Sequence, residues 1–193
     1  RARPVVGDAG LCGEIAETVH AALTMPRDPE KLLADVRDMR ARIAREHPPK
    51  DAWHIKHLHG GLVDIEFLAQ TLQLRHAQAH PDVLAEGTAP ALVKLRDAGV
   101  LDADEAASLL DAARLMRRVQ GLLRLTAGED FDEATAPEGV KTQLARACDG
   151  ADFESLRAQV LDRAATVRHI FDRHIGGVAD RPGIEAVLAE AGT

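Results

Sequence analysis

Residues 61–79 constrain the fold more than any other segment, because a helix built from them has apolar side chains on two sides. At 100° per residue, Val63, Phe67 and Leu74 share one side, and the opposite side carries Leu62, Ile65, Leu68, Ala69 and Leu72. A helix with two apolar faces is packed between neighbours. We therefore expect this helix to lie inside a bundle.

The rest of the chain also shows helical periodicity, and no segment alternates apolar and polar residues as a strand does. Apolar residues make up 46% of the sequence but aromatic ones only 3%, with Leu and Ala dominant, which favours helices. Helices are expected at about 8–23, 29–46, 61–79, 88–99, 102–127, 138–148 and 152–176. We predict an all-α fold, an elongated bundle of about seven helices.

Several helix boundaries have recognisable signals. Asp28-Pro29 combines a capping acid with proline at the first helical position. Thr88 is expected to cap the fourth helix, and Asp102 with Glu105 has the form of a capping box.

In the second helix an apolar face is expected through Leu32, Val36, Met39 and Ile43. The arginines that alternate with these positions are interpreted as a solvated face, namely Arg37, Arg40, Arg42 and Arg45.

Charge and composition exclude several classes of function. The net charge of −7 argues against a nucleic acid or an anionic membrane as the main partner, and there is no apolar run near 18 residues. Cys12 and Cys148 are far apart and give neither a disulfide framework nor a zinc spacing, which fits a reduced, cytoplasmic compartment. The chain begins Arg-Ala-Arg-Pro without methionine, so we expect a piece of a longer protein.

Two acids stand among apolar residues in helix 61–79. Asp64 and Glu66 point about 160° apart, so they cannot share a metal ion or form a carboxylate pair. Asp64 lies in the first turn, where it could cap the helix, form an ion pair or face a site. Glu66 falls on one polar seam with Gln70 and Gln73, which we interpret as structural hydrogen bonding.

The segment before this helix has two interpretations. Gly60-Gly61 could simply be a turn that lets the loop enter the helix. It could also form a nest of backbone amides at the helix N-terminus, to which Lys56 adds charge for a phosphate. No metal site is predicted: His54, His57 and His59 lack a further ligand, and the Asp102–Asp104 pair is better explained as a helix cap.

Two segments resemble the glutamine synthetase adenylyltransferase family: Asp35-Val-Arg-x-Met-Arg-x-Arg and Lys56-x-x-x-Gly-Gly-Leu-x-Asp-Ile-Glu-Phe-x-x-Gln-x-Leu-x-Leu-Arg. The resemblance implies a helical domain at residues 29–176, preceded at 1–28 by the end of a nucleotidyltransferase domain and followed by a tail at 177–193. The family's catalytic Gly-Ser and Asp-x-Asp signature is missing, so the chain alone is expected to be inactive.

The resemblance also implies a function. Residues 127–137 lack the histidine of the adenylyl-removing half, which favours the C-terminal half that transfers AMP from ATP, with Mg²⁺, to a tyrosine of glutamine synthetase under control by PII protein and glutamine. No cofactor is expected in this chain itself. Lys56, Gly60, Gly61 and Asp64 would face the catalytic cleft. The alternatives are a module that docks glutamine synthetase or PII, and part of a PII uridylyltransferase, which has a similar Gly-Gly-Leu-x-Asp-Ile stretch.

Overall fold

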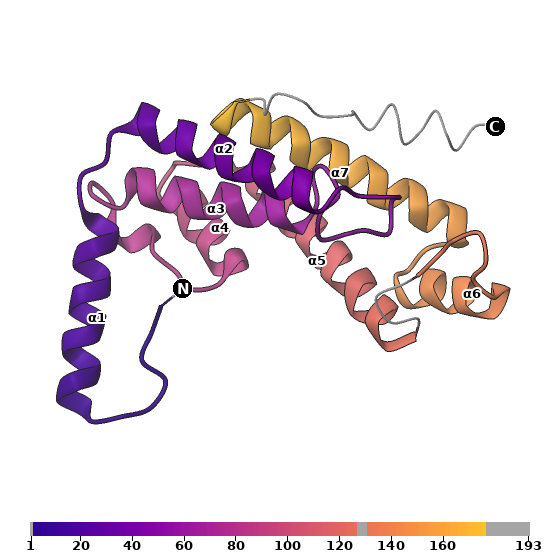
Figure 1. Cartoon of the computed structure of the whole chain (residues 1–193), viewed down its shortest axis with the longest axis horizontal. Coiled ribbons are helices and arrows are strands. Elements are labelled where there is room, and N and C mark those ends of the chain that lie inside the picture. The colour runs from indigo at the N-terminus through magenta and orange to yellow at the C-terminus, as the bar shows by residue number, and fades with distance from the viewer. Residues whose placement is uncertain (1, 127–130, 177–193) are drawn as a thin grey trace.

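The computed structural model describes residues 2–126 and 131–176, and within these ranges the fold is all-α, as predicted (Figure 1). The helices agree with the expected segments to within about three residues at each end. They are α1 (Ala9–Thr24), α2 (Pro29–Glu46), α3 (Leu62–His76), α4 (Thr88–Asp97), α5 (Ala103–Thr126), α6 (Glu138–Ala147) and α7 (Phe153–Ile175), with a short 3₁₀ turn, η1 (Pro81–Val83), before α4.

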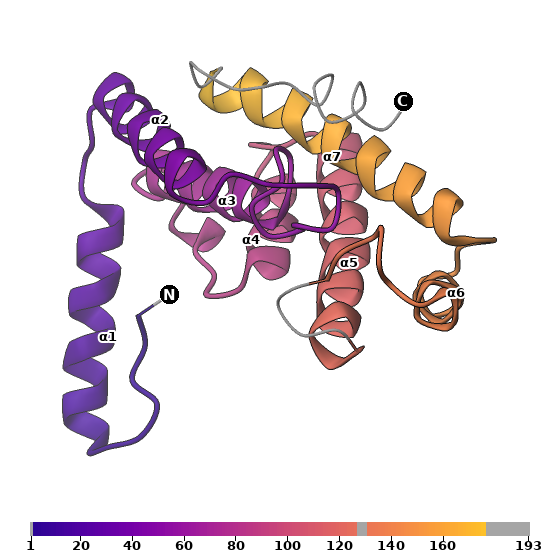
Figure 2. The same ribbon diagram turned by 45° about the vertical axis from the view of Figure 1, so that its right-hand side comes forward.

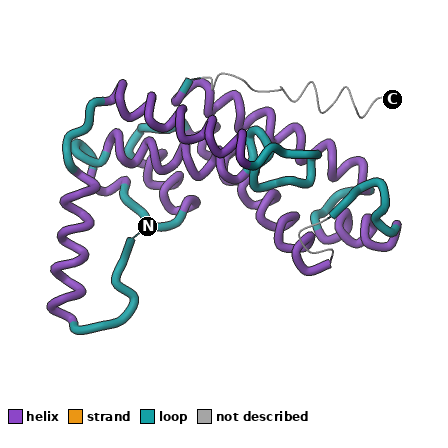
Figure 3. The backbone as a smooth tube through the Cα atoms, in the orientation of Figure 1, coloured by secondary structure: helices purple, strands orange, loops and turns teal. Residues whose placement is uncertain are grey.

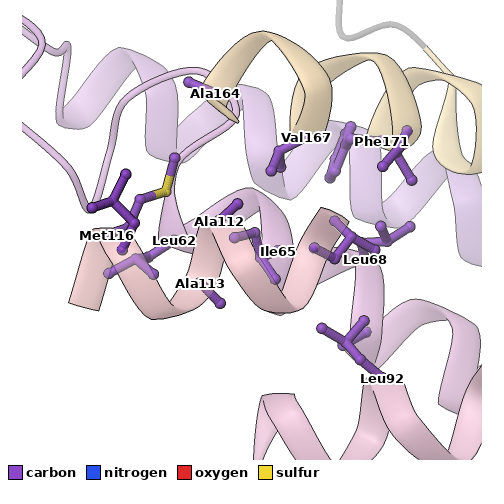
Figure 4. Close-up of a cluster of buried hydrophobic side chains, with 14 of the residues drawn as sticks. Leu62, Ile65, Leu68, Leu92, Ala112, Ala113, Met116, Ala164, Val167 and Phe171 are labelled. Carbon is purple, nitrogen blue, oxygen red and sulfur yellow. The ribbon is translucent and has the colours of Figure 1, made fainter. Parts of the chain in front are cut away.

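Helix α3 lies at the centre of the bundle and contacts α2, α4, α5 and α7. The main core forms where α3, α4, α5 and α7 meet (Figure 4). Leu68, Leu92, Met116 and Phe171, one from each helix, are completely buried there. Each such side chain contributes about 1.5–3 kcal/mol on burial. The second apolar face of α3 is also covered, since Val63 is buried and Phe67 and Leu74 are half-buried.

The helix starts are fixed largely by aspartates. Asp28 accepts hydrogen bonds from the first amides of α2, and Asp152 accepts one from Ser155 N in α7 at 2.7 Å. Asp102 accepts from Glu105 N at 2.7 Å, which is one half of the predicted capping box. The prediction for Thr88 is wrong, because Gly87 occupies the capping position and Thr88 is the first residue of α4.

The buried side of α2 differs from the expected one. Leu33 and Arg40 are the buried residues of this helix, whereas Met39, assigned to the apolar face, is 46% exposed. The stripe that faces the bundle is therefore displaced by about one position. It runs through Leu33, Val36 and Arg40, at the three- and four-residue steps of one helix face.

Helix α1 contains no buried residue and projects away from the bundle in both ribbon views (Figures 1 and 2). This arrangement agrees with assigning residues 1–28 to a neighbouring domain, an assignment that stays a prediction. Residues 177–193 lie outside the described part of the chain. No helix in the described ranges has the length and apolarity needed to cross a membrane.

Candidate functional site

The connection from α2 to α3, residues 47–61, folds into a compact loop at the ends of the two helices (Figure 3). Its own carbonyls accept from the first amides of α3: Leu62 N donates to Ile55 O and Val63 N to Lys56 O, both at 3.1 Å. Gly61 N donates to Leu58 O at 2.7 Å. These amides already have acceptors, so the loop is a turn and does not form the phosphate-binding nest.

Gly60 and Gly61 are required because backbone atoms pack against them. Gly60 has a φ of +79°, and a Cβ there would lie 1.9 Å from the carbonyl oxygen of Ala164 in α7. A Cβ on Gly61 would lie 2.4 Å from the carbonyl oxygen of Ile55. The glycine pair therefore lets the loop sit directly against α7 and turn back into α3.

Asp64 forms a buried ion pair with Arg40 of α2, and both side chains are fully enclosed. Its Oδ1 accepts from Nε of Arg40, Oδ2 lies 3.4 Å from Nη2, and Oδ2 also accepts from Gly60 N at 2.6 Å. One carboxylate thus joins α2, the glycine turn and α3. Of the alternatives for Asp64, the ion pair is the one observed. The interpretation of Arg40 as part of a solvated face is wrong, and its neighbour Arg37 also turns inward, donating to Ile175 O at 2.9 Å.

A cavity of about 280 Å³ lies between this loop and the last turns of α5. The loop contributes five consecutive residues, and the lining consists of Trp53, His54, Ile55, Lys56, His57, Gln120, Leu123, Arg124 and Phe131. Of the four residues predicted to face a cleft, only Lys56 is exposed and lines this cavity. The other three residues, Gly60, Gly61 and Asp64, are buried behind the cavity wall. Whether the four face a catalytic domain stays a prediction.

An aromatic cluster supports one wall of the cavity. The chain has one tryptophan and four phenylalanines, and three of these rings meet here. Trp53 stacks on Phe153 with ring centroids 4.6 Å apart and meets Phe131 edge-on at 5.8 Å. Its indole Nε1 donates to Glu133 Oε2 at 2.7 Å. This cluster could not be predicted from the sequence, because its members lie far apart in the chain.

The electrostatic environment of the cavity is cationic. Burial, as the larger cause, and the neighbouring charges of Lys56, His47, Arg40 and His54 together lower the pKa of His57 to about 4. His57 is therefore neutral near pH 7. The ring of His54 is oriented by Asp51, whose Oδ1 lies 3.0 Å from Nδ1. No group of three or more His, Cys, Asp or Glu side chains in the described ranges is arranged to hold a metal ion.

Of the predicted polar seam of α3 (Glu66, Gln70 and Gln73), Gln73 forms hydrogen bonds that join α3 to another segment. Gln73 is buried, accepts from Ala85 N at 2.7 Å and donates to Ala69 O at 3.4 Å, so it ties α3 to the segment before α4. Glu66 is half-buried and Gln70 is exposed, and their structural role stays a prediction. Gln70 and Gln73 also line a second cavity of about 330 Å³ beneath α1.

The fold and site define an all-α domain organised around one central helix and a buried Arg–Asp pair. A family model described as GlnD PII-uridylyltransferase matches residues 37–175, and the chain belongs to this family. The match covers α3 and every residue of the cavity lining.

The chain is also similar to proteins named bifunctional glutamine synthetase adenylyltransferase/adenylyl-removing enzyme. The identity is 42% with the protein of Rhodopseudomonas palustris (strain HaA2), over 92% of this chain and 18% of that protein. It is 37% with the Xanthobacter autotrophicus protein, over 93% of this chain and 18% of that protein. The chain thus spans about a fifth of the length of these curated relatives. The resemblance noted from the sequence is confirmed.

Proposed function

We propose that this chain is the helical domain of the C-terminal, adenylylating half of a glutamine synthetase adenylyltransferase. That enzyme would transfer AMP from ATP to a tyrosine of glutamine synthetase in the cytoplasm, under control by PII protein and glutamine. The identity of 37–42% with proteins of that name supports the assignment. The helical domain would support the active site of a preceding nucleotidyltransferase domain and would not carry the reaction itself.

The observation that carries this proposal is the placement of Lys56. Its side chain is exposed at a cavity, on a loop held from behind by the Arg40–Asp64 pair and the Gly60 amide. A lysine fixed in this way can stabilise the negative charge of a transferring phosphoryl group. In this account Asp64, Gly60 and Gly61 are positioning residues, and Lys56 makes the contact with ATP. The described residues supply no Mg²⁺ site, so the ion's ligands would come from the catalytic domain.

The test uses the longer protein that carries this domain. It would be incubated with glutamine synthetase and α-³²P-labelled ATP, and in parallel with PII protein and α-³²P-labelled UTP. We expect label on glutamine synthetase and none on PII. Label on PII alone would overturn the proposal in favour of the uridylyltransferase alternative.

A second candidate function is a module that docks glutamine synthetase or PII. It is favoured by α1, which has no buried residue and exposes Leu11 (56%) and Ile15 (40%) near the exposed Val5 and Val6. Calorimetry of the chain with each protein tests this candidate. Binding with a Kd of tens of micromolar would support the docking function if the double variant Leu11→Asp, Ile15→Asp loses it. Absence of binding would contradict the docking function.

A further inference from the structure

We propose that the cavity between the 53–57 loop, α5 and Phe131 binds a diphosphate or triphosphate group, with Lys56 and Arg124 as its two cationic ligands. This inference rests on the proposed function in assigning Lys56 to phosphate contact. It goes further by naming a second cation on a different element, the cavity that both cations line and a ligand class.

The charges of the lining support an anionic ligand. Lys56 comes from the loop and Arg124 from the last turn of α5, and neither forms an ion pair with another described residue. Among the described residues that line the cavity there is no Asp or Glu. Two exposed cations without an ion-pair partner in the described ranges thus lie beside one cavity, in a chain whose net charge is −7. An anion bound in the cavity would be attracted by both charges.

The uncharged side chains provide further donors. Gln120 lies one turn before Arg124 on α5 and contributes an amide group to the lining. His57 is neutral, and the positive field of its neighbours is the second cause of its lowered pKa after burial. A neutral imidazole can donate one N–H without adding charge. Arginine, lysine and such neutral donors together are the usual ligands of phosphate oxygens in proteins.

The size of the cavity restricts the ligand. Its volume of about 280 Å³ is close to the lower limit of small-molecule sites, about 300 Å³. A diphosphate or triphosphate chain fits such a volume, whereas a nucleotide would have to leave its base and sugar outside. The shared chemistry is therefore the phosphate chain, either free as pyrophosphate or tripolyphosphate or carried by a nucleoside triphosphate.

Trp53 is the only tryptophan of the chain and lines the cavity, so its fluorescence can report binding directly. The 193-residue chain would be titrated with pyrophosphate, tripolyphosphate and ATP, with calorimetry in parallel and sulfate as the control for unspecific anions. We expect saturable binding that weakens with added salt. Tighter binding of ATP than of tripolyphosphate would assign the site to a nucleotide, and equal binding would assign it to free polyphosphate.

The variants Lys56→Ala and Arg124→Ala should each weaken binding at least about tenfold, the effect of a lost charge-assisted hydrogen bond. Arg75→Ala is the matched control, an exposed arginine in the last turn of α3, and should bind as the unmodified chain does. Absence of binding in both measurements up to about 10 mM, or equal binding by all variants, would overturn the inference. If Lys56→Ala nevertheless slows adenylyl transfer by the longer protein, the proposed function stands and only this site is wrong.

Discussion

Arg40 and Asp64, 24 positions apart, form an ion pair whose side chains are both fully buried. The pair joins α2 to α3 at the point where the glycine turn enters α3, because the same carboxylate accepts the amide of Gly60. A buried ion pair is sensitive to the loss of one partner, since the remaining charge cannot be solvated. This relationship fixes the loop that presents Lys56.

Asp64→Asn should destabilise the chain by about 3–5 kcal/mol, because it leaves the guanidinium of Arg40 buried without a counter-charge. The double variant Arg40→Met, Asp64→Leu should recover most of this loss, because it removes both buried charges. About 1 kcal/mol should remain lost, because the amide of Gly60 no longer has its acceptor. Urea unfolding measures both. Arg118→Ala, which breaks the exposed pair with Asp149, is the control and should cost less than about 1 kcal/mol. Equal losses for the buried and exposed pairs would contradict this reading.

Gly60→Ala and Gly121→Ala should change stability in opposite directions. At Gly60 the new Cβ would overlap the Ala164 carbonyl and the φ is +79°, so we expect a loss above about 3 kcal/mol. Gly121 lies inside α5 with open space around it, so alanine should stabilise the helix there by about 0.5–1 kcal/mol. Thermal unfolding of the two variants distinguishes them. A tolerated Gly60→Ala would mean that the loop can move away from α7.

His57 should make the fold sensitive to acid. Its pKa is lowered from 6.5 to about 4 in the folded chain, so the unfolded chain binds more protons between these values and stability falls as the pH drops from 6.5 towards 4. Urea midpoints at pH 7 and pH 5 should differ less in His57→Gln than in the unmodified chain. A smaller slope should remain, because the pKa of His76 is also lowered, chiefly by burial. If the urea midpoint of His57→Gln changes with pH as much as that of the unmodified chain, His57 is not a source of the acid sensitivity.

Glu105 should contribute to stability by joining the start of α5 to the end of α7. Its carboxylate lies 3.0 Å from Nε2 of His174 and 2.9 Å from Nη1 of Arg173, with 9% of its side chain exposed. Glu105→Ala should cost about 1.5–3 kcal/mol, the usual range for hydrogen bonds to a charged group. Glu154→Ala, an exposed acid in the first turn of α7, serves as the comparison. If chemical denaturation gives both variants the same loss of unfolding free energy, the contacts of Glu105 with His174 and Arg173 do not stabilise the fold.

The helices could be predicted from the sequence because their signals are local. Capping aspartates, prolines and three- and four-residue apolar steps act within a few positions of each helix end. The two-faced pattern of α3 also predicted its central place correctly, since it follows from side-chain spacing alone.

The site could be predicted only in part, because its key contacts are long-range. Gly60 needs to be glycine because of Ala164, and Asp64 is neutralised by Arg40 on another helix. One signal was present: Arg40 lies four residues after Val36 and seven after Leu33, on the apolar stripe of α2. A charged residue at such a position indicates a buried partner. The aromatic cluster and Arg124 had no comparable local signal.

If the buried network holds Lys56 for nucleotidyl transfer, as we propose, the rate of that transfer is the most direct test. In the longer protein, Lys56→Ala should lower AMP transfer to glutamine synthetase at least about tenfold, while the urea midpoint of the 193-residue chain stays unchanged because Lys56 is exposed. Arg75→Ala should leave both values as they are. Unchanged transfer in Lys56→Ala would contradict the account.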